Sequence, residues 1–328
     1  MSKTVPAAPA AAQAVERLDP ALVAAAPALV PLGLDAATLP AIRASLDQRR
    51  ADAARGLATG AVTVEAATLT LADRAVGLRV YRGTAARRAP ALLYLHSGAY
   101  VLGNLDTDHA RCVALAREAG CVVVSVDYRL APEHPYPAAL DDATAALAAL
   151  HAAPAGYGVD PGRVAVGGNS AGAGLAAAVA LRARDTGGPP LRFQLLHQPM
   201  LDHRCGTPSM REFTGTPGFD AASARFAWSC YAGDGSPYAS PTAARSLAGL
   251  PPAYVSCSEI DPLRDEAIAY AWRLMEHGVP TELHVHPGTC HGFDSLAPSL
   301  SRSTAALSAQ ARALAHAFAR PDCAAAAG

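Results

Sequence analysis

The chain has 328 residues, of which 51% are hydrophobic and 17% are charged. This balance excludes general disorder, and the length suits one large α/β domain or two average ones. The 27 Lys and Arg residues against 28 Asp and Glu residues leave a formal charge of −1. Because binders of nucleic acid or of membrane surfaces usually carry a basic excess, we expect neither kind of partner.

The cysteine pattern and the N-terminal segment bear on location. The seven cysteines are scattered and form no CxxC pair, so neither a disulfide framework nor a zinc ribbon is indicated. Reduced thiols of this kind are typical of the cytoplasm, where we expect the protein. Prolines and polar residues interrupt residues 1–20, which makes them a poor signal peptide. No apolar run reaches the length of a membrane span.

The first third of the chain passes from helix to strand. Residues 1–55 are predicted to be helical with polar interruptions, with a second helix from about Ala36 to Arg55. Residues 62–71 and 76–83 alternate with period two, which predicts antiparallel strands. Apolar runs without alternation follow, as in strands buried on both faces. They cover residues 91–96, 121–126, 163–168, 193–198 and 253–258.

Helical patterns separate these apolar runs, at residues 106–120, 139–152, 171–185 and 265–278. A last strand is predicted at 281–286, before a C-terminal helix near 294–319. Alternation of this kind predicts a doubly wound, mostly parallel sheet, in which 281–286 is the edge strand. Residues 203–235 interrupt the rhythm with a long aromatic-rich segment, which we interpret as a lid or cap because structureless loops of that length are rare.

A GxSxG motif, Gly168-Asn169-Ser170-Ala171-Gly172, follows one apolar run and opens the next helical pattern. A strand–turn–helix of this sequence is the context of a nucleophile elbow, in which glycines allow close backbone approach. We therefore interpret Ser170 as a nucleophile. The alternative is an ordinary glycine-containing turn between a strand and a helix.

A serine nucleophile needs a histidine to take its proton and an acid to orient that histidine. Asp261 lies just beyond the strand predicted at 253–258, and His291 lies just beyond the strand at 281–286. The carboxyl ends of adjacent parallel strands meet at one edge of a sheet. The chain order of nucleophile, acid and histidine is the one found in hydrolases with this elbow.

Rival residues flank both candidates. Asp265 and Glu266 lie in the following helical pattern and are expected to face solvent. His284 and His286 lie within the predicted strand, where packed or surface histidines are common. With Cys290 and the candidate base, these two histidines also resemble a metal cluster, because residues i and i+2 share one strand face. Since a metal site needs several convergent ligands, we expect no metal.

An oxyanion hole requires backbone N–H groups from the residue after the nucleophile and from the loop after the third strand. Ala171 supplies the first, and the loop has the sequence His96-Ser97-Gly98-Ala99-Tyr100. We expect His96 to hold the loop rather than to move protons. A polar scaffold beneath the site is expected from Asp127, Tyr128, Arg129 and Glu133.

The chain resembles the hormone-sensitive-lipase-like branch of the α/β-hydrolases, the bacterial family IV esterases. The matching stretches are HSGAYVLGNLDTDH, DYRLAPEHPYPAALDD, GNSAG, DPLRDE and PGTCHGF, which run from about residue 91 to 293. The resemblance implies an α/β-hydrolase fold, with a mostly parallel central sheet of about eight strands, flanking helices and a helical cap. It implies that residues 1–55 and 203–235 form the cap, and that 56–202 and 236–328 form the core.

The same resemblance implies site residues and a reaction. Its implied roles are nucleophile Ser170, acid Asp261, base His291 and N–H donors Gly98, Ala99 and Ala171. Substrates would be small carboxylic esters with short or medium acyl chains, hydrolysed through an acyl-enzyme without a cofactor. Family members often dimerise, so a homodimer through strand 281–286 and the C-terminal helix is also expected.

Two motifs depart from the family pattern. The usual HGGG appears as His96-Ser97-Gly98-Ala99, and the usual Asp before the nucleophile is Asn169. Because a residue with a Cβ avoids positive φ, we expect negative φ at Ser97 and Ala99, in a loop that still forms a working hole.

The triad alone leaves the reaction open. An amidase, a lactonase or a carbamate hydrolase would use the same residues. A catalytically inactive small-molecule receptor on this fold is less favoured, because such receptors typically lose a triad member and this chain keeps all three.

Overall fold

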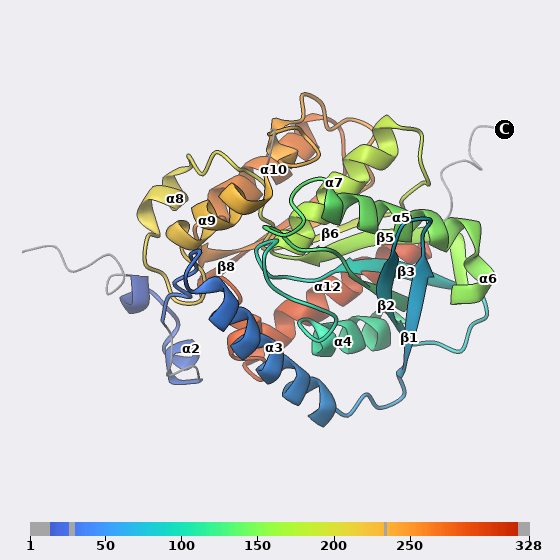
Figure 1. Ribbon diagram of the computed structural model, residues 1–328, viewed down its shortest axis with the longest axis horizontal. Helices are drawn as coiled ribbons and strands as arrows, with labels where there is room; N and C mark the ends of the chain where they lie inside the picture. The colour runs from blue at the N-terminus through green and yellow to red at the C-terminus, as the bar shows by residue number, and fades with distance from the viewer. Residues whose placement is uncertain (1–13, 26–29, 233–234, 321–328) are drawn as a thin grey trace, which may run out of the picture.

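The computed structural model describes residues 14–25, 30–232 and 235–320. Its centre is an eight-stranded sheet with the order β1-β2-β4-β3-β5-β6-β7-β8 (Figure 1). The strands are β1 (Thr63–Thr70), β2 (Ala75–Arg82), β3 (Ala89–Leu95), β4 (Val122–Asp127), β5 (Val159–Asn169), β6 (Gln194–His197), β7 (Ala253–Ile260) and β8 (Thr281–Cys290). Only the pairs β1–β2 and β2–β4 are antiparallel. The predicted mostly parallel sheet is confirmed, with β8 at its edge.

Helices connect and cover these strands. They are α2 (Pro20–Ala25), α3 (Leu39–Gly56), α4 (His109–Ala119), α5 (Ala138–Ala152), α6 (Pro154–Tyr157), α7 (Ala171–Asp185), α8 (Pro208–Glu212), α9 (Ala221–Tyr231), α10 (Arg264–Glu276), α11 (Phe293–Leu296) and α12 (Ser301–Ala319), with the 3-10 helix η1 (Pro241–Ala243). Within the described ranges, no helix is long and apolar enough to cross a membrane.

The predicted helix near 294–319 is divided into α11 and α12. Pro298 lies in the gap, and Ala297 before it has φ −137° and ψ 67°. Proline lacks an N–H group and disfavours helical geometry in the residue before it, so a continuous helix was the wrong expectation.

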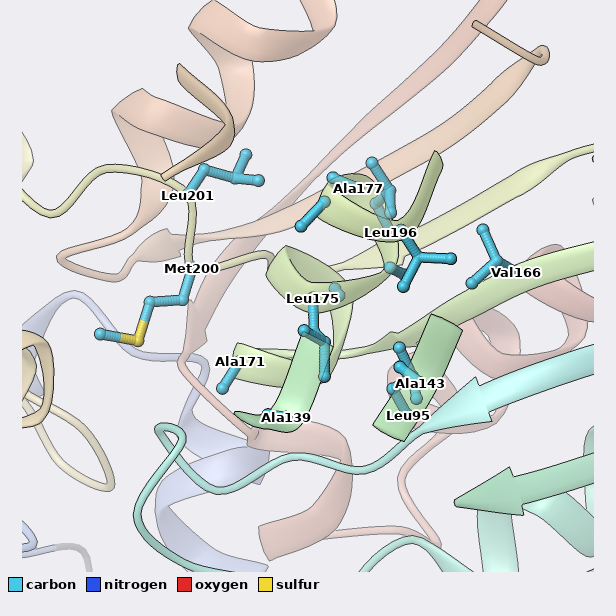
Figure 2. Packing of buried hydrophobic residues seen from close by; sticks show 14 of the residues in the cluster. Leu95, Ala139, Ala143, Val166, Ala171, Leu175, Ala177, Leu196, Met200 and Leu201 are labelled. Carbon is cyan, nitrogen blue, oxygen red and sulfur yellow. The ribbon is translucent and has the colours of Figure 1, made fainter. Parts of the chain in front are cut away.

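Helices cover both faces of the sheet. Figure 1 shows α4 and α12 on one side and α5, α7 and α10 on the other. Alternate residues of β3 enter the two buried clusters: Leu93 and Leu95 face α7, whereas Leu92 and Tyr94 face α4 and α12. Figure 2 shows the first of these layers, with Leu95 near the small side chains of α5 and α7. Burial on both faces explains why the strands are continuous apolar runs.

The segment predicted as an insertion is not a structureless loop, since it carries α8 and α9. It lies beside the N-terminal segment: Pro31 pairs with Gly218, and the Leu34 N–H donates to Ser223 Oγ at 3.3 Å. In Figure 1, α2, α3, α8 and α9 gather at one end of the molecule.

Candidate active site

Ser170 occupies a sharp turn between β5 and α7. Its backbone has φ 57° and ψ −120°, a conformation that costs energy for a residue with a side chain. The flanking glycines are required by crowding, because a Cβ on Gly168 or Gly172 would lie 2.4 or 2.0 Å from the carbonyl oxygen of Leu95. The predicted elbow is present, and it holds Ser170 at the carboxyl edge of the sheet.

The three residues singled out as a triad form one hydrogen-bonded chain. Ser170 Oγ lies 2.9 Å from Nε2 of His291, and Nδ1–H of His291 donates to Oδ2 of Asp261 at 2.8 Å. The other oxygen of Asp261 accepts the Leu263 N–H at 2.8 Å. All three side chains are buried. This arrangement allows a proton to pass from a serine hydroxyl to an oriented imidazole.

The rival acids have other partners. Asp265 accepts the N–H of Ser209 at 2.7 Å. Glu266 was expected to face solvent, and this was wrong: it is 1% exposed. Its Oε1 accepts the N–H groups of Leu201 and Asp202 at 2.6 and 3.2 Å, so it binds backbone donors in the loop after β6. Burial raises the pKa of Glu266 well above its usual value.

The two histidines of β8, His284 and His286, contact aromatic rings and, for His284, a carboxylate. His284 stacks on Tyr254 with ring centroids 5.0 Å apart, and its Nε2 bonds Glu282 at 2.6 Å. His286 packs against Phe293, and burial lowers its pKa to about 4. Among the residues that the structure describes, no three potential metal ligands come together.

The oxyanion loop contains left-handed backbone. Gly98, Ala99 and Tyr100 have φ values of 137°, 54° and 61°, whereas Ser97 has no positive φ. The expectation of negative φ is therefore wrong for Ala99. The cause is a tight turn in which Gly98 O accepts the N–H of Leu102 at 2.7 Å. A Cβ on Gly98 would lie 2.0 Å from that residue's carbonyl oxygen, so glycine is required there.

Buried polar groups hold the start of this loop. The Ser97 N–H donates to Asp108 Oδ2 at 2.7 Å, and Nδ1–H of His96 donates to the Ser97 carbonyl at 2.9 Å. The His96 ring stacks on Tyr128, whose hydroxyl donates to the His96 carbonyl at 2.8 Å. Burial lowers the pKa of His96 to about 4, so the ring is neutral near pH 7. These contacts fit the holding role expected for His96.

The candidate donors are free to bind a substrate oxygen. The backbone N–H groups of Gly98 and Ala99 have no acceptor within the described part of the chain. Ala171 is the first residue of α7, where an N–H has no partner within the helix. None of the three N–H groups predicted from the sequence is therefore used by another acceptor in the described residues.

We expect Ala99→Gly to stabilise the protein modestly. Left-handed backbone costs a residue with a Cβ about 1–2 kcal/mol, and the greater chain entropy of glycine offsets about 0.5–1 kcal/mol of that. The free energy of unfolding in a denaturant titration should therefore rise by about 0.5–1 kcal/mol. Turnover should stay within about tenfold, which is about 1.4 kcal/mol, because the N–H donors are unchanged.

Ser97→Gly is the matched control, since Ser97 has no positive φ to relieve. It should not increase stability. A hundredfold gain in turnover from Ala99→Gly would instead mean that the natural loop forms a damaged oxyanion hole.

The expected polar scaffold fixes the surroundings of the loop. Arg129 pairs with the fully buried Asp142 at 2.9 Å. Glu133 pairs with Arg43 of α3 at 2.6 Å, and Arg43 also donates to the carbonyl of Val101 at 2.6 Å. The N-terminal helix α3 is therefore tied directly to the residues that follow the oxyanion loop.

Sequence reasoning missed several buried polar residues near the site. Gln198 has φ 48°, and its Oε1 accepts the N–H of Gly292, the residue after His291, at 2.7 Å. Arg111 and Asp294 form a buried ion pair at 2.6 Å. No local signal marked Arg111 for burial, because the helical pattern 106–120 also carries Asp106, Asp108 and other polar residues.

Known proteins are similar to this chain in sequence. A family model described as alpha/beta hydrolase fold matches residues 92–295. Esterase LipI of Mycobacterium tuberculosis is 45% identical over 226 residues, which are 66% of this chain and 70% of that protein. Carboxylesterase NlhH of the same species is 41% identical over 266 residues, which are 75% of this chain and 83% of that protein.

Solved structures of esterases are similar to this chain in fold and in sequence. The crystal structure of esterase LipW from Mycobacterium marinum superposes with a TM-score of 0.90 at 48% identity, covering 94% of this chain and 98% of that one. A structure titled bacterial heroin esterase superposes with a TM-score of 0.88 at 38% identity, covering 93% of this chain and 99% of the other.

Proposed function

Because the chain belongs to the hormone-sensitive-lipase-like branch of the α/β-hydrolase family, we propose that it is a serine carboxylesterase acting through Ser170, Asp261 and His291. The chain is a carboxylic ester hydrolase, and the proposal concerns the residues that act and the small esters, with short to medium acyl chains, that it prefers. The observation that carries it is the chain of contacts at 2.9 and 2.8 Å from Ser170 through His291 to Asp261.

The geometry suits a two-step reaction. Ser170 Oγ attacks the ester carbonyl while Nε2 of His291 accepts the serine proton, and Asp261 stabilises the resulting imidazolium. The N–H groups of Gly98, Ala99 and Ala171 bind the tetrahedral oxyanion. His291 then protonates the leaving alcohol, and it activates a water molecule that hydrolyses the acyl-enzyme. No step calls for a cofactor.

Amidase, lactonase and carbamate hydrolase activities remain alternatives, because they would use the same triad. A panel of p-nitrophenyl esters of increasing acyl length, esters of bulky alcohols, lactones, carbamates and matched anilides separates them. We expect turnover to be greatest on short to medium esters and far lower on anilides. Higher kcat/KM on an anilide, a lactone or a carbamate than on every ester would replace the assignment, and no turnover on any substrate would favour a receptor.

We also propose that residues 1–55 and 203–235 form a cap over the site. The ring centroid of Phe219, in the second segment, lies 5.1 Å from that of His291. Arg17 pairs with Glu212 at 2.5 Å, which joins the first segment to α8. The cap would then exclude water and bind the acyl chain.

Deletion of residues 1–40 tests this cap. The deletion removes Leu22 and Leu34, which are buried, but no residue of the sheet. We expect a folded sheet with exposed apolar surface, and at least tenfold lower kcat/KM toward hydrophobic acyl esters. Circular dichroism checks the fold. Unchanged kinetics on the longer acyl esters would show that the N-terminal segment is not part of the pocket.

We propose a homodimer through strand 281–286 and the C-terminal helix. In support, β8 is an edge strand, and Val285 on it is 43% exposed. An exposed edge with apolar side chains is commonly covered by pairing. Light scattering at micromolar concentration should give the mass of two chains, and Val285→Arg should shift it toward one. A monomer mass for the unaltered protein would contradict the proposal.

We propose a cytoplasmic location. The six cysteines in the described part of the chain are free thiols, and burial raises the pKa of Cys121, Cys257 and Cys290 to about 12. Buried, protonated thiols without disulfides suit a reducing compartment.

A further inference from the structure

A network of buried charged side chains runs into the core from the histidine loop, residues 291–294, which contains His291 and the start of α11. Arg111 of α4 donates to Oδ2 of Asp294 at 2.6 Å, and both side chains are buried. The same oxygen accepts Nε2–H of His197 at 3.0 Å, and Nδ1 of that ring accepts the hydroxyl of Ser256 at 2.7 Å. Burial alone would raise the pKa of Asp294, but Arg111 and His197 outweigh it and hold the pKa well below its usual range.

The network continues from Arg111 to the oxyanion loop. Nε of Arg111 lies 3.9 Å from Oδ1 of Asp108. The other oxygen of Asp108 accepts the Ser97 N–H, one residue before the first oxyanion donor. Nη1 of Arg111 donates to Gln310 of α12 at 3.1 Å. One guanidinium therefore faces carboxylates that belong to two separate parts of the site.

The location of the Arg111–Asp294 ion pair suggests a role other than stability. Replacing a buried ion pair by apolar residues is often neutral or stabilising, so its presence is weak evidence for a role in stability. Asp294 lies three residues after His291, in α11, and Asp108 binds the start of the loop that carries the donors Gly98 and Ala99. Arg111 thus contacts both the segment that follows His291 and the aspartate that binds the start of the oxyanion loop.

We infer that Arg111 is a positioning residue, which holds the histidine loop and the oxyanion loop in register around Ser170. The inference rests on the function proposed above. Loss of this register would displace the base and the N–H donors relative to the reacting carbonyl. Because those groups act on the transition state, kcat should fall while KM changes little.

The test compares two variants with the unaltered protein. Arg111→Met alone would leave Asp294 as an unpaired buried charge, so the first variant is Arg111→Met combined with Asp294→Asn. It removes this ion pair, keeps an acceptor for His197 and leaves Asp108 with the Ser97 N–H as its partner. The second is Arg111→Lys, which keeps the charge but cannot bridge three partners with a planar fork. The readouts are kcat and KM on p-nitrophenyl butyrate and the inhibition constant of a trifluoromethyl ketone, which becomes tetrahedral on the serine.

We expect kcat to fall about tenfold to a hundredfold in the double variant, with KM within about twofold and a weaker inhibition constant in parallel. Arg111→Lys should lie between the double variant and the unaltered protein. Arg163→Met is the control, because Arg163 pairs with Asp160 at 2.9 Å at the start of β5, the end of that strand remote from Ser170. Its kcat should be unchanged.

Three results would overturn the inference: unchanged kcat in a folded variant, a rise in KM alone, or an equal loss of kcat in Arg163→Met. If the double variant does not fold, Arg111→Lys decides by the same criteria. Failure of the proposed function would look different, because the unaltered protein itself would then lack turnover that depends on Ser170.

Discussion

Ser170→Ala is expected to lower kcat on p-nitrophenyl butyrate by about 10⁵–10⁶-fold. The substitution removes the hydroxyl oxygen that lies 2.9 Å from Nε2 of His291. The proposed oxyanion donors are backbone groups that alanine leaves in place, so the variant should keep a small rate above water and bind substrate with a similar KM. We therefore expect the loss in the chemical step and not in substrate binding.

The fold should survive this change, because Ser170 forms its backbone hydrogen bonds through its own N–H and carbonyl groups, which alanine retains. Ser246→Ala, at an exposed position, is the control and should keep full activity. Retention of more than about a hundredth of the activity in Ser170→Ala, in a sample free of the unaltered enzyme, would move the nucleophile elsewhere.

Asp261→Asn is expected to cost about 10⁴-fold in kcat. The carboxylate accepts two N–H groups, one from His291 and one from Leu263. An amide at this place offers one oxygen, and retaining the backbone contact turns its NH₂ group toward the imidazole. Nδ1 must then accept a hydrogen bond, which places the proton of the neutral ring on Nε2. A protonated Nε2 can no longer accept the proton of Ser170.

Asp265→Asn is the matched control, since Asp265 lies one turn away and binds Ser209 and Arg264 instead. Measured at a single pH with the same ester, this variant should retain its kcat. If Asp265→Asn lost activity and Asp261→Asn did not, the acid would be the rival residue.

The sheet and the hydrogen-bonded arrangement of Ser170, His291 and Asp261 could be predicted because their signals are local. Strands buried on both faces read as continuous apolar runs, and Ser170 and Asp261 follow two of them, β5 and β7, whereas His291 follows the edge strand β8. The carboxyl ends of parallel strands share one edge, so three positions distant in sequence converge without knowledge of the loops. The elbow glycines reflect crowding by one backbone carbonyl, that of Leu95.

The errors concern interactions between distant segments. Glu266 looked like a solvent-facing helical residue, but the loop after β6 brings two unpaired N–H groups to it. Ala99 takes a left-handed conformation because the turn closed by Gly98 and Leu102 imposes it, and local preference alone predicts the opposite. The position of Arg111 between two carboxylates depends on the packing of α4 against the histidine loop, which no local pattern encodes.

Covalent labelling tests the central claim most directly. A fluorophosphonate requires an activated serine and an oxyanion hole at once, so it reports the assembled site rather than one residue. Peptide mapping by mass spectrometry should find one stoichiometric adduct on Ser170, with loss of esterase activity in proportion to labelling and no adduct in Ser170→Ala. An active enzyme that carries the adduct on another serine, or that stays active after Ser170 is fully modified, would contradict the account.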